Sequence, residues 1–438
     1  MALRILIAGG GVAGLAVARA LRARCPLSAA DITVWQPHRP VDGWWGGMTL
    51  TPSACRVLDA ALGVWPAVSA DDASVAIDAF VTTDAAGDEL LRLAPAAAPD
   101  YAPYGYPMIS VERAALIAAL ADSAAPAPED RALASVAHVP GAGRTVVATD
   151  ADGGADDFDL VIAADGIHSV LAPNDDAPLL DLGLKTVRGV SDSVAAAEAV
   201  TAMGGATLAL GRGVSWFARV LPGGRSQWAV TFHSPEDASF PDGERGLARV
   251  AALAADAGLL ASDSLAVAAS LDGTPSDVLR IHQLRDRDPA AVGSYLVSGD
   301  DGEVLGARIG DAAHPMSPFS GAGAVAALED AAVLAHTVAD AAAGKIDIAH
   351  ALRAYNALRF EAGTAMVLRG RTATTTSHTR GAFTGFLRNK FLGFTGSMLE
   401  RAQAANKANH VIAEHMYDTA SLDYDAAYEA TASPPADP

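Results

Sequence analysis

Three glycine-containing stretches hold the residues of this chain that are best suited to binding a cofactor. The first runs from Gly9 to Gly14, the second is Asp165-Gly166-Ile167-His168-Ser169, and the third begins at Gly310-Asp311. In the first, Gly9, Gly11 and Gly14 have the G-x-G-x-x-G spacing of a turn that binds the pyrophosphate of a dinucleotide. Several dinucleotides bind to such turns, so this spacing alone leaves FAD and NAD(P) as alternatives.

The elements around the first stretch predict how it is positioned. Residues Leu3 to Ala8 have the pattern of a buried strand, Gly14 to Arg24 continue as an alanine-rich helix, and Asp31 to Gln36 form a second strand. This is the beginning of a βαβ unit. The helix that follows the glycines would present free N–H groups and its positive dipole end to a pyrophosphate.

The third stretch carries a family resemblance. It continues from Ala312 through His314, Pro318 and Gly321 to Gly323 and is followed by Ala327-Leu328-Glu329-Asp330-Ala331. In these residues the chain resembles the FAD-dependent aromatic hydroxylases, and most closely the salicylate and p-hydroxybenzoate hydroxylase-like single-component monooxygenases. With the first two stretches, with Arg113 and with segments near residues 185 and 222, the resemblance extends from residue 3 to about residue 370.

The resemblance implies an FAD site. Asp311 would accept hydrogen bonds from the ribityl hydroxyls, Arg113 would make charge-assisted contacts with the pyrophosphate, and Pro318 would fix the backbone beside the flavin ring. Backbone N–H groups near Gly321 could stabilise negative charge on a reduced flavin. The residues expected to bind FAD are Gly9, Gly11, Val12, Ala13, Gly14, Gln36, Arg113, Asp165, Gly166, Gly310, Asp311, Pro318, Gly321, Ala322 and Gly323.

Two positions depart from the family pattern. Gln36 stands where a glutamate usually binds the adenosine ribose, and the lost charge assistance is worth on the order of 1 kcal/mol. Ala172 stands where the second motif usually ends in an arginine. From Thr145 to Leu184 there are nine aspartates and no Lys or Arg, a surface that would repel the phosphates of a nicotinamide dinucleotide.

The expected fold class is α/β: a Rossmann-like FAD-binding domain of the p-hydroxybenzoate hydroxylase type, with an inserted antiparallel β-sheet substrate domain and C-terminal helices. A chain of 438 residues exceeds what one hydrophobic core normally organises. We assign residues 1–72, 106–178 and 285–345 to the FAD-binding domain and residues 73–105 and 179–284 to the substrate domain. Residues 346–418 are expected to form a helical region, and residues 419–438 a loose tail.

Composition and charge exclude several classes of function. The formal charge of −20 disfavours nucleic acid and anionic lipid as partners. Two cysteines, Cys25 and Cys55, are too few for a disulfide framework and lack the spacing of a metal site, so we expect no metal and a cytoplasmic location. The charge is uneven, however. Residues 345–407 contain ten Lys or Arg and three acids, and we expect this stretch to face something anionic.

Candidates for the substrate pocket follow from strand alternation. Arg219, Trp228 and His233 lie on two expected strands of the second sheet, where alternate residues should face the pocket, although a structural role is the favoured alternative for each. His314 and Pro318 adjoin the expected flavin loop, and a histidine before proline could brace the turn rather than transfer protons. The aromatic residues from Phe383 to Phe394 could contact a membrane, but packing of this segment on the core is the favoured alternative.

The resemblance implies a monooxygenase in which NAD(P)H, a transient reductant, reduces FAD, which then reacts with O2. A flavin C4a-hydroperoxide would hydroxylate or epoxidise an aromatic or polycyclic, natural-product-like small molecule, in a monomer or homodimer. Two alternatives remain open. One is a related flavoenzyme, such as a dehydrogenase or reductase, that does not transfer oxygen. The other is a flavin-bound protein whose redox role has been lost, a possibility that Ala172 and the aspartate-rich stretch keep open.

Overall fold

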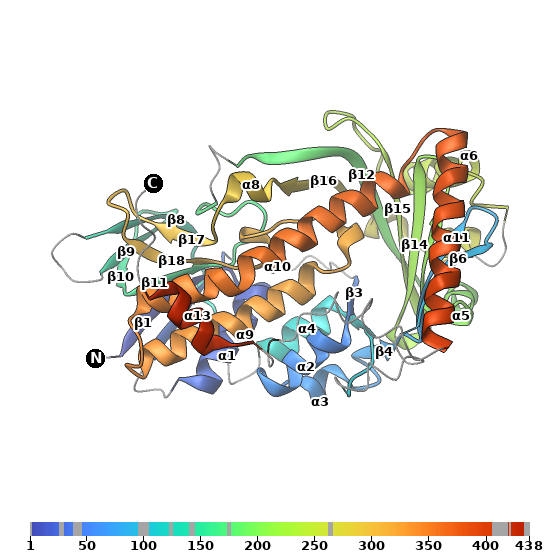
Figure 1. Cartoon of the computed structure of the whole chain (residues 1–438). Coiled ribbons are helices and arrows are strands. Elements are labelled where there is room, and N and C mark those ends of the chain that lie inside the picture. Colours follow the sequence, from blue (N-terminus) through green and yellow to red (C-terminus); the bar gives the residue numbers. More distant parts are fainter. Residues whose placement is uncertain are drawn as a thin grey trace.

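The computed structural model of the chain is shown in Figure 1. It describes residues 2–25, 30–37, 46–94, 105–121, 126–139, 145–172, 177–261, 266–404, 419 and 422–432. Two large sheets lie at opposite ends of the molecule, and long C-terminal helices connect them (Figure 1). No helix in these ranges is both long enough and apolar enough to cross a membrane.

The first large sheet has five strands. Their order is β17 (Leu296–Ser298), β18 (Val304–Arg308), β11 (Leu160–Ala163), β1 (Leu3–Ala8) and β2 (Ala30–Trp35). All are parallel except β17, and the pairings Ala8↔Ala163 and Ala163↔Arg308 bring three carboxyl ends to one edge of the sheet. In an open α/β sheet this is the edge at which ligands bind.

Helices and a small sheet cover the two faces of this five-stranded sheet. On one side, α1 (Val12–Arg24) packs against α9 (Gly323–Ala342), and the fully buried Leu15, Leu21 and Leu328 contribute to the core between them. On the other side lies a three-stranded sheet of β10 (Ala155–Phe158), β9 (Val146–Asp150) and β8 (Leu133–His138). Coverage of both faces explains why β1 and β11 are nearly continuous apolar runs.

The second large sheet has seven strands, and only the pairing of β13 with β5 is parallel. Its strands, in order, are β16 (Arg280–Arg287), β12 (Leu179–Ser191), β15 (Arg225–His233), β14 (Val214–Leu221), β13 (Gly205–Leu210), β5 (Ala79–Asp84) and β6 (Glu89–Leu93). Helices α5 (Val194–Ala202), α6 (Gly243–Asp256) and α7 (Val267–Asp272) cover one face. We call the other face the open face. A further small sheet of β3 (Gly47–Leu50), β7 (Ile109–Glu112) and β4 (Ser74–Ala76) adjoins β14.

The C-terminal part of the chain is helical. The 30-residue helix α10 (Ile348–Ser377) runs from the first large sheet to the second, and α11 (Ala382–Ala404) then follows the outer edge of the second sheet against β6 (Figure 1). The predicted combination of a Rossmann-like α/β unit, an antiparallel sheet and C-terminal helices is confirmed. The domain boundaries themselves stay a prediction.

Two features of the C-terminal region differ from expectation. Residues 419–438 were expected to form a loose tail, but α13 (Tyr424–Thr431) forms there, because Asp423 caps it and Tyr428 donates a hydrogen bond of 2.8 Å to Asp340. The aromatic residues of α11 do not pack on the core. Phe383 is 71% exposed, and both Phe391 and Phe394 are 66% exposed.

Candidate cofactor and active site

The turn after β1 is shaped by two close approaches that exclude side chains. Gly9 has φ +111°, and a Cβ there would overlap the carbonyl oxygen of Ala164 and lie 2.9 Å from the Cα of Asp165. A Cβ at Gly14 would overlap the carbonyl oxygen of Gly9. The glycines therefore let α1 and the end of β11 meet the turn directly.

Gly11 faces open space instead. No atom lies within 4 Å of the position that its Cβ would occupy, and no side chain caps the N-terminus of α1 at this residue. The N–H groups of the first turn of a helix have no intrahelical partner, so they are available to an anion. Beside the turn, the N–H of Gly10 donates a hydrogen bond of 2.6 Å to Oε1 of Gln36, which follows β2.

The second and third stretches follow β11 and β18 at the same edge of the sheet. Asp165 and Asp311 are both exposed, yet each lies in a recess among protein atoms, and this partial desolvation raises the pKa of both carboxyls. Both carboxyls are thus reached by solvent on one side and surrounded by protein on the other. Gly310 has φ +57°, and a Cβ there would come within 3.0 Å of Ala13. The three stretches thus form one cradle.

A buried ionic cluster holds the third stretch in place. Asp330 of α9 accepts hydrogen bonds from the N–H of Gly310 (2.9 Å) and from Nε of Arg359 (2.7 Å), and Nε2 of His314 lies 2.6 Å from its carboxylate. Although burial opposes these effects, the charges of His314 and Arg359 lower the pKa of Asp330 to about 2, and Asp330 raises the pKa of His314. Beside them, burial raises the pKa of Glu329 to about 7.

The cluster decides where His314 lies. The side chain is buried behind the loop and bound to Asp330, a position that suits bracing of the turn better than proton transfer to a substrate. Glu329 and Asp330 belong to the segment that carries the family resemblance, but sequence reasoning gave them no role. The sequence did contain a signal for their role: two adjacent carboxylates stand in an otherwise apolar helix, and buried carboxylates need partners.

The loop from Ser317 to Gly321, which we call the loop of Pro318, is anchored to α10. Pro318 and Phe319 form a short 3-10 turn that Gly321 ends with φ +63°, and Ser317 before it lies 2.6 Å from the hydroxyl of Thr374. Pro318 is exposed at the tip. One turn earlier, Gly370 allows close packing, since a Cβ there would approach Ser320 to 3.2 Å.

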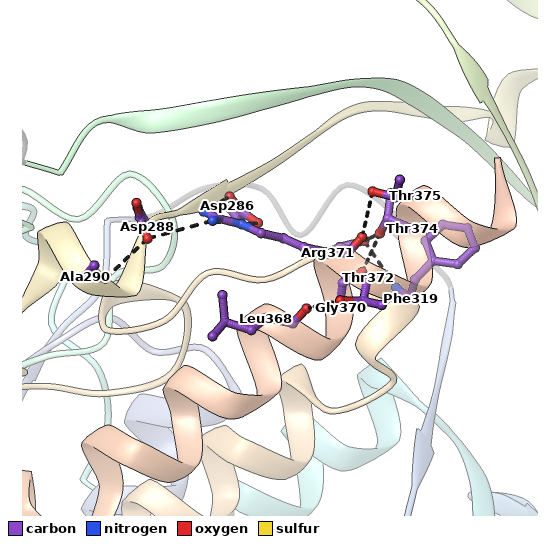
Figure 2. Close-up of polar contacts among 11 residues, drawn as sticks. Asp286, Asp288, Ala290, Phe319, Leu368, Gly370, Arg371, Thr372, Thr374 and Thr375 are labelled. Atoms are coloured by element: carbon purple, nitrogen blue, oxygen red, sulfur yellow. Dashed lines mark hydrogen bonds and ion pairs between the residues drawn. The ribbon is translucent and has the colours of Figure 1, made fainter. Parts of the chain in front are cut away.

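The same part of α10 also holds the second sheet. Arg371 donates two hydrogen bonds, of 2.7 and 2.9 Å, to the buried carboxylate of Asp286 in β16, and its Nη1 lies 3.8 Å from Asp288 (Figure 2). Figure 2 shows that Phe319, which belongs to the loop of Pro318, lies beside Thr374 of α10. This helix therefore fixes the loop of Pro318 relative to the seven-stranded sheet.

Cationic side chains lie on the open face of the seven-stranded sheet. Burial lowers the pKa of Arg219 to about 9 and that of Arg188 to about 10, and the charge of Arg188 also lowers the pKa of Arg219. Arg219 donates a hydrogen bond of 3.2 Å to Thr49 and pairs with no carboxylate in the described part of the chain. Burial and the charges of Arg188 and Arg280 lower the pKa of His282 to about 4, so it is neutral at neutral pH.

The other pocket candidates lie apart. Trp228 is on the helix-covered face, where it stacks on Trp216 with ring centroids 5.1 Å apart and donates a hydrogen bond of 2.8 Å to Thr274. His233 is on the open face at the end of β15, 2.8 Å from the carbonyl oxygen of His378. Arg188 was missed as a candidate, although the alternation that indicated Arg219 applies equally to β12.

Arg113 begins α4 (Arg113–Leu120), and burial lowers the pKa of its guanidinium. In the ranges that the structure describes, no group of three or more His, Cys, Asp or Glu side chains could hold a metal ion.

Comparisons with known proteins agree with this arrangement. No protein-family model matches the chain. The curated FAD-dependent monooxygenase AusM of Penicillium brasilianum is 26% identical over 348 residues, which are 76% of this chain and 69% of that protein. The crystal structure of HpxO of Klebsiella pneumoniae, in complex with FAD and uric acid, is 21% identical, with a TM-score of 0.73 over 93% of this chain and 96% of that chain.

A second solved structure has the same fold. It is a salicylate hydroxylase in complex with its substrate, 22% identical, with a TM-score of 0.67 over 99% of both chains. The curated relative agrees with the predicted resemblance to FAD-dependent monooxygenases, and the two solved structures show that this chain has the fold of such enzymes.

Proposed function

We propose that this chain binds FAD at the edge of the five-stranded sheet and uses NAD(P)H and O2 to oxygenate an aromatic or polycyclic acid. The observation that carries the proposal is the convergence of three glycine-containing turns at one edge of the five-stranded sheet, together with a second sheet whose open face presents Arg188 and Arg219.

The residues present fit FAD. The open side of Gly11 and the uncapped start of α1 suit the pyrophosphate, and Gln36 lies at the end of β2, where it can reach the adenosine ribose. The recessed carboxylate of Asp311 suits the hydroxyls of a ribityl chain. Arg113 is the candidate for charge-assisted contacts with the phosphates.

Bound FAD would supply the redox chemistry and the oxygen transfer, and the chain would position the reactants. Pro318 and Gly321 hold the loop beside the proposed flavin site in one conformation, because Ser317 and Gly370 fasten it to α10. The N-terminus of α9 follows directly at Gly323, and its free N–H groups would stabilise negative charge that develops on the ring.

The open face indicates the charge of the substrate. A guanidinium in a desolvated position is costly unless an anion faces it, and Arg219 has no carboxylate partner among the described residues; its buried Nε has no hydrogen-bond partner there. A carboxylate or phenolate on the substrate would supply that anion and would orient the ring toward the loop of Pro318. The neutral His282 nearby leaves the arginines as the cations of this face.

The first test is flavin content, followed by turnover. Purified protein should be yellow or should take up FAD with the visible spectrum of a bound flavin, and aromatic acids should accelerate its oxidation of NADH or NADPH with formation of an oxygenated product. Neutral methyl esters of the same acids are the matched controls and should have higher KM values. Arg219→Gln should raise KM for the acids toward that for the esters. If no phenolic, indolic or polyketide acid accelerates NAD(P)H oxidation, the proposed activity is wrong.

A second candidate function is a flavin-bound protein without oxygenase activity. It is favoured by Ala172, where the family pattern has an arginine, and by the nine aspartates between Thr145 and Leu184. Mixing with NADH or NADPH under nitrogen distinguishes the two functions. Rapid bleaching of the flavin followed by substrate-dependent product formation in air supports the oxygenase; a flavin that never bleaches supports the second candidate.

A further inference from the structure

A groove of about 700 Å³ opens at the end of the seven-stranded sheet that lies near the start of α11. The residues that line it belong to the turn from β13 to β14, the loop from β15 to α6, α6 itself and the junction of α10 with α11. Neither the proposed FAD site nor the arginines of the open face belong to it. Of the pocket candidates named above, His233 lines the groove, and Arg219, Trp228, His314 and Pro318 do not.

The charge of this groove is opposite to that of the protein. Three arginines, Arg212, Arg249 and Arg380, are among its fourteen lining residues, and none of those residues is an aspartate or glutamate. The chain as a whole has 51 acids and 31 bases, so such a composition is unexpected. All three arginines are exposed, and in the described ranges none of them has an ion pair or a side-chain hydrogen bond.

Separate elements position the three guanidinium groups. Arg212 is in the tight turn between β13 and β14, Arg249 is on α6, and Arg380 follows α10. The N–H of Gly213 donates a hydrogen bond of 3.0 Å to the carbonyl oxygen of Thr379, and a Cβ at Gly213 would come within 3.2 Å of the Arg380 side chain. The turn and the helix junction are thus joined, and their arginines are held at one rim.

The floor of the groove is apolar. Phe232 and Phe240 lie with ring centroids 5.6 Å apart, and Val214 and Leu253 adjoin them. Aromatic faces bind flat rings, and exposed guanidinium groups bind phosphate oxygens. The groove therefore combines the two kinds of contact that a phosphorylated ring compound needs.

We propose that this groove is a binding site for a nucleotide, with its phosphates on Arg212, Arg249 and Arg380 and a ring on the phenylalanines. Three unpaired cations match the multiple charges of a dinucleotide better than the single charge of an aromatic acid. The positive charge of these three arginines would offset the repulsion that the net charge of −20 exerts on such an anion. Arg380 is one of the ten Lys and Arg between residues 345 and 407.

The groove also adjoins the proposed active site. His233 lines the groove, its Nε2 lies 2.8 Å from the carbonyl oxygen of His378, and the ring of His378 lies edge-on to Phe319 with centroids 4.8 Å apart. Two side chains thus separate the groove from the loop of Pro318. The identification of the nucleotide as the nicotinamide reductant rests on the proposed function; the binding site itself does not.

The experiment measures binding of NADP⁺ to the full-length, oxidised protein by calorimetry, because NADP⁺ is not consumed there. Arg249→Gln and Arg380→Gln should each raise Kd about fivefold, and the double variant about twentyfold, with a weaker dependence on salt. Arg245→Gln is the matched control: it removes the same charge from the same exposed face of α6, but Arg245 does not line the groove, and Kd should change less than twofold.

A second probe, 1-naphthoate, has a flat ring and a single charge. Its affinity should change less than twofold in the same variants. The proposal is wrong if wild-type protein binds no NADP⁺, if the double variant binds it like wild type, or if naphthoate loses as much affinity as NADP⁺, which would indicate a groove for monoanions. The flavin spectrum of every sample reports separately on the proposed function, so the two proposals can fail independently.

Discussion

Replacement of Gly14 by alanine is the sharpest test of how the first turn is built. A Cβ at this position would overlap the carbonyl oxygen of Gly9 and lie 2.9 Å from its carbonyl carbon. Both atoms belong to the backbone of the turn, which Gly9 N fastens to the carbonyl oxygen of Trp35 at 2.8 Å. Therefore neither the turn at Gly9 nor α1 can move away from the new methyl group without disrupting the packing of α1 against β1.

The expected magnitude follows from two opposing effects. Overpacking against a rigid backbone costs about 3 kcal/mol, and the better helix propensity of alanine over glycine returns about 1 kcal/mol. The net loss of stability is about 2 kcal/mol, which lowers the Tm of a unit of 150 to 250 residues by about 4 to 8 °C. Because the strain arises within the protein, this loss should appear without added FAD.

Gly11→Ala is the matched control. No atom lies within 4 Å of the position of its Cβ, so the Tm of the flavin-free protein should fall by less than about 2 °C, while affinity for FAD falls because the methyl group enters the open side of the turn. Thermal unfolding of both variants, with and without FAD, measures these effects. A Gly14→Ala protein that melts like wild type, or a Gly11→Ala protein that is equally destabilised, would refute the reasoning.

Three further outcomes are expected. Gln36→Glu should lower the Kd for FAD about fivefold in a flavin fluorescence titration, because a charged acceptor strengthens hydrogen bonds from a ribose; an unchanged Kd would contradict this placement of Gln36. Asp330→Asn should lower the free energy of unfolding by about 3 kcal/mol or more in urea, since buried His314 and Arg359 would lose the carboxylate that pairs with both and only Glu329 would remain beside Arg359. Burial raises the pKa of Glu329 to about 7. Between about pH 4.5 and 7 the native state therefore keeps a proton on this carboxyl that the unfolded chain has lost. As a result, Glu329 makes the free energy of unfolding fall as the pH rises from 4.5 to 7. In the Glu329→Gln variant, the free energy of unfolding measured in urea should fall less between pH 4.5 and pH 7 than it does in wild type. If both proteins lose the same amount of stability, Glu329 does not have the raised pKa.

The sequence was sufficient for much of the fold and for the cofactor cradle. The spacing of Gly9, Gly11 and Gly14 after a buried strand is a local signal, because close backbone approaches exclude side chains whatever the rest of the protein does. The strand before Asp165 and the strand before Gly310 carry similar local signals. Parallel pairing of these strands then brings their carboxyl ends together, so their convergence could be predicted.

The open face of the seven-stranded sheet could be predicted only in part. Alternation made both Arg219 and Trp228 pocket candidates, but it gave neither the register that puts them on opposite faces nor the face that α5, α6 and α7 cover. That choice depends on contacts between residues far apart in the chain. It puts Trp228 in the core and leaves Arg188 and Arg219 on the open face.

The amino-acid sequence alone determined that three turns would meet at one sheet edge, since each turn is encoded by its own glycines and its own preceding strand. Only the tertiary structure decided the partners of the charged residues. Asp330 finds His314 and Arg359 across three elements, and Arg212, Arg249 and Arg380 gather at one groove from three others. Charge acts through space over distances that sequence separation does not reveal, so these sites appear only once the chain is folded.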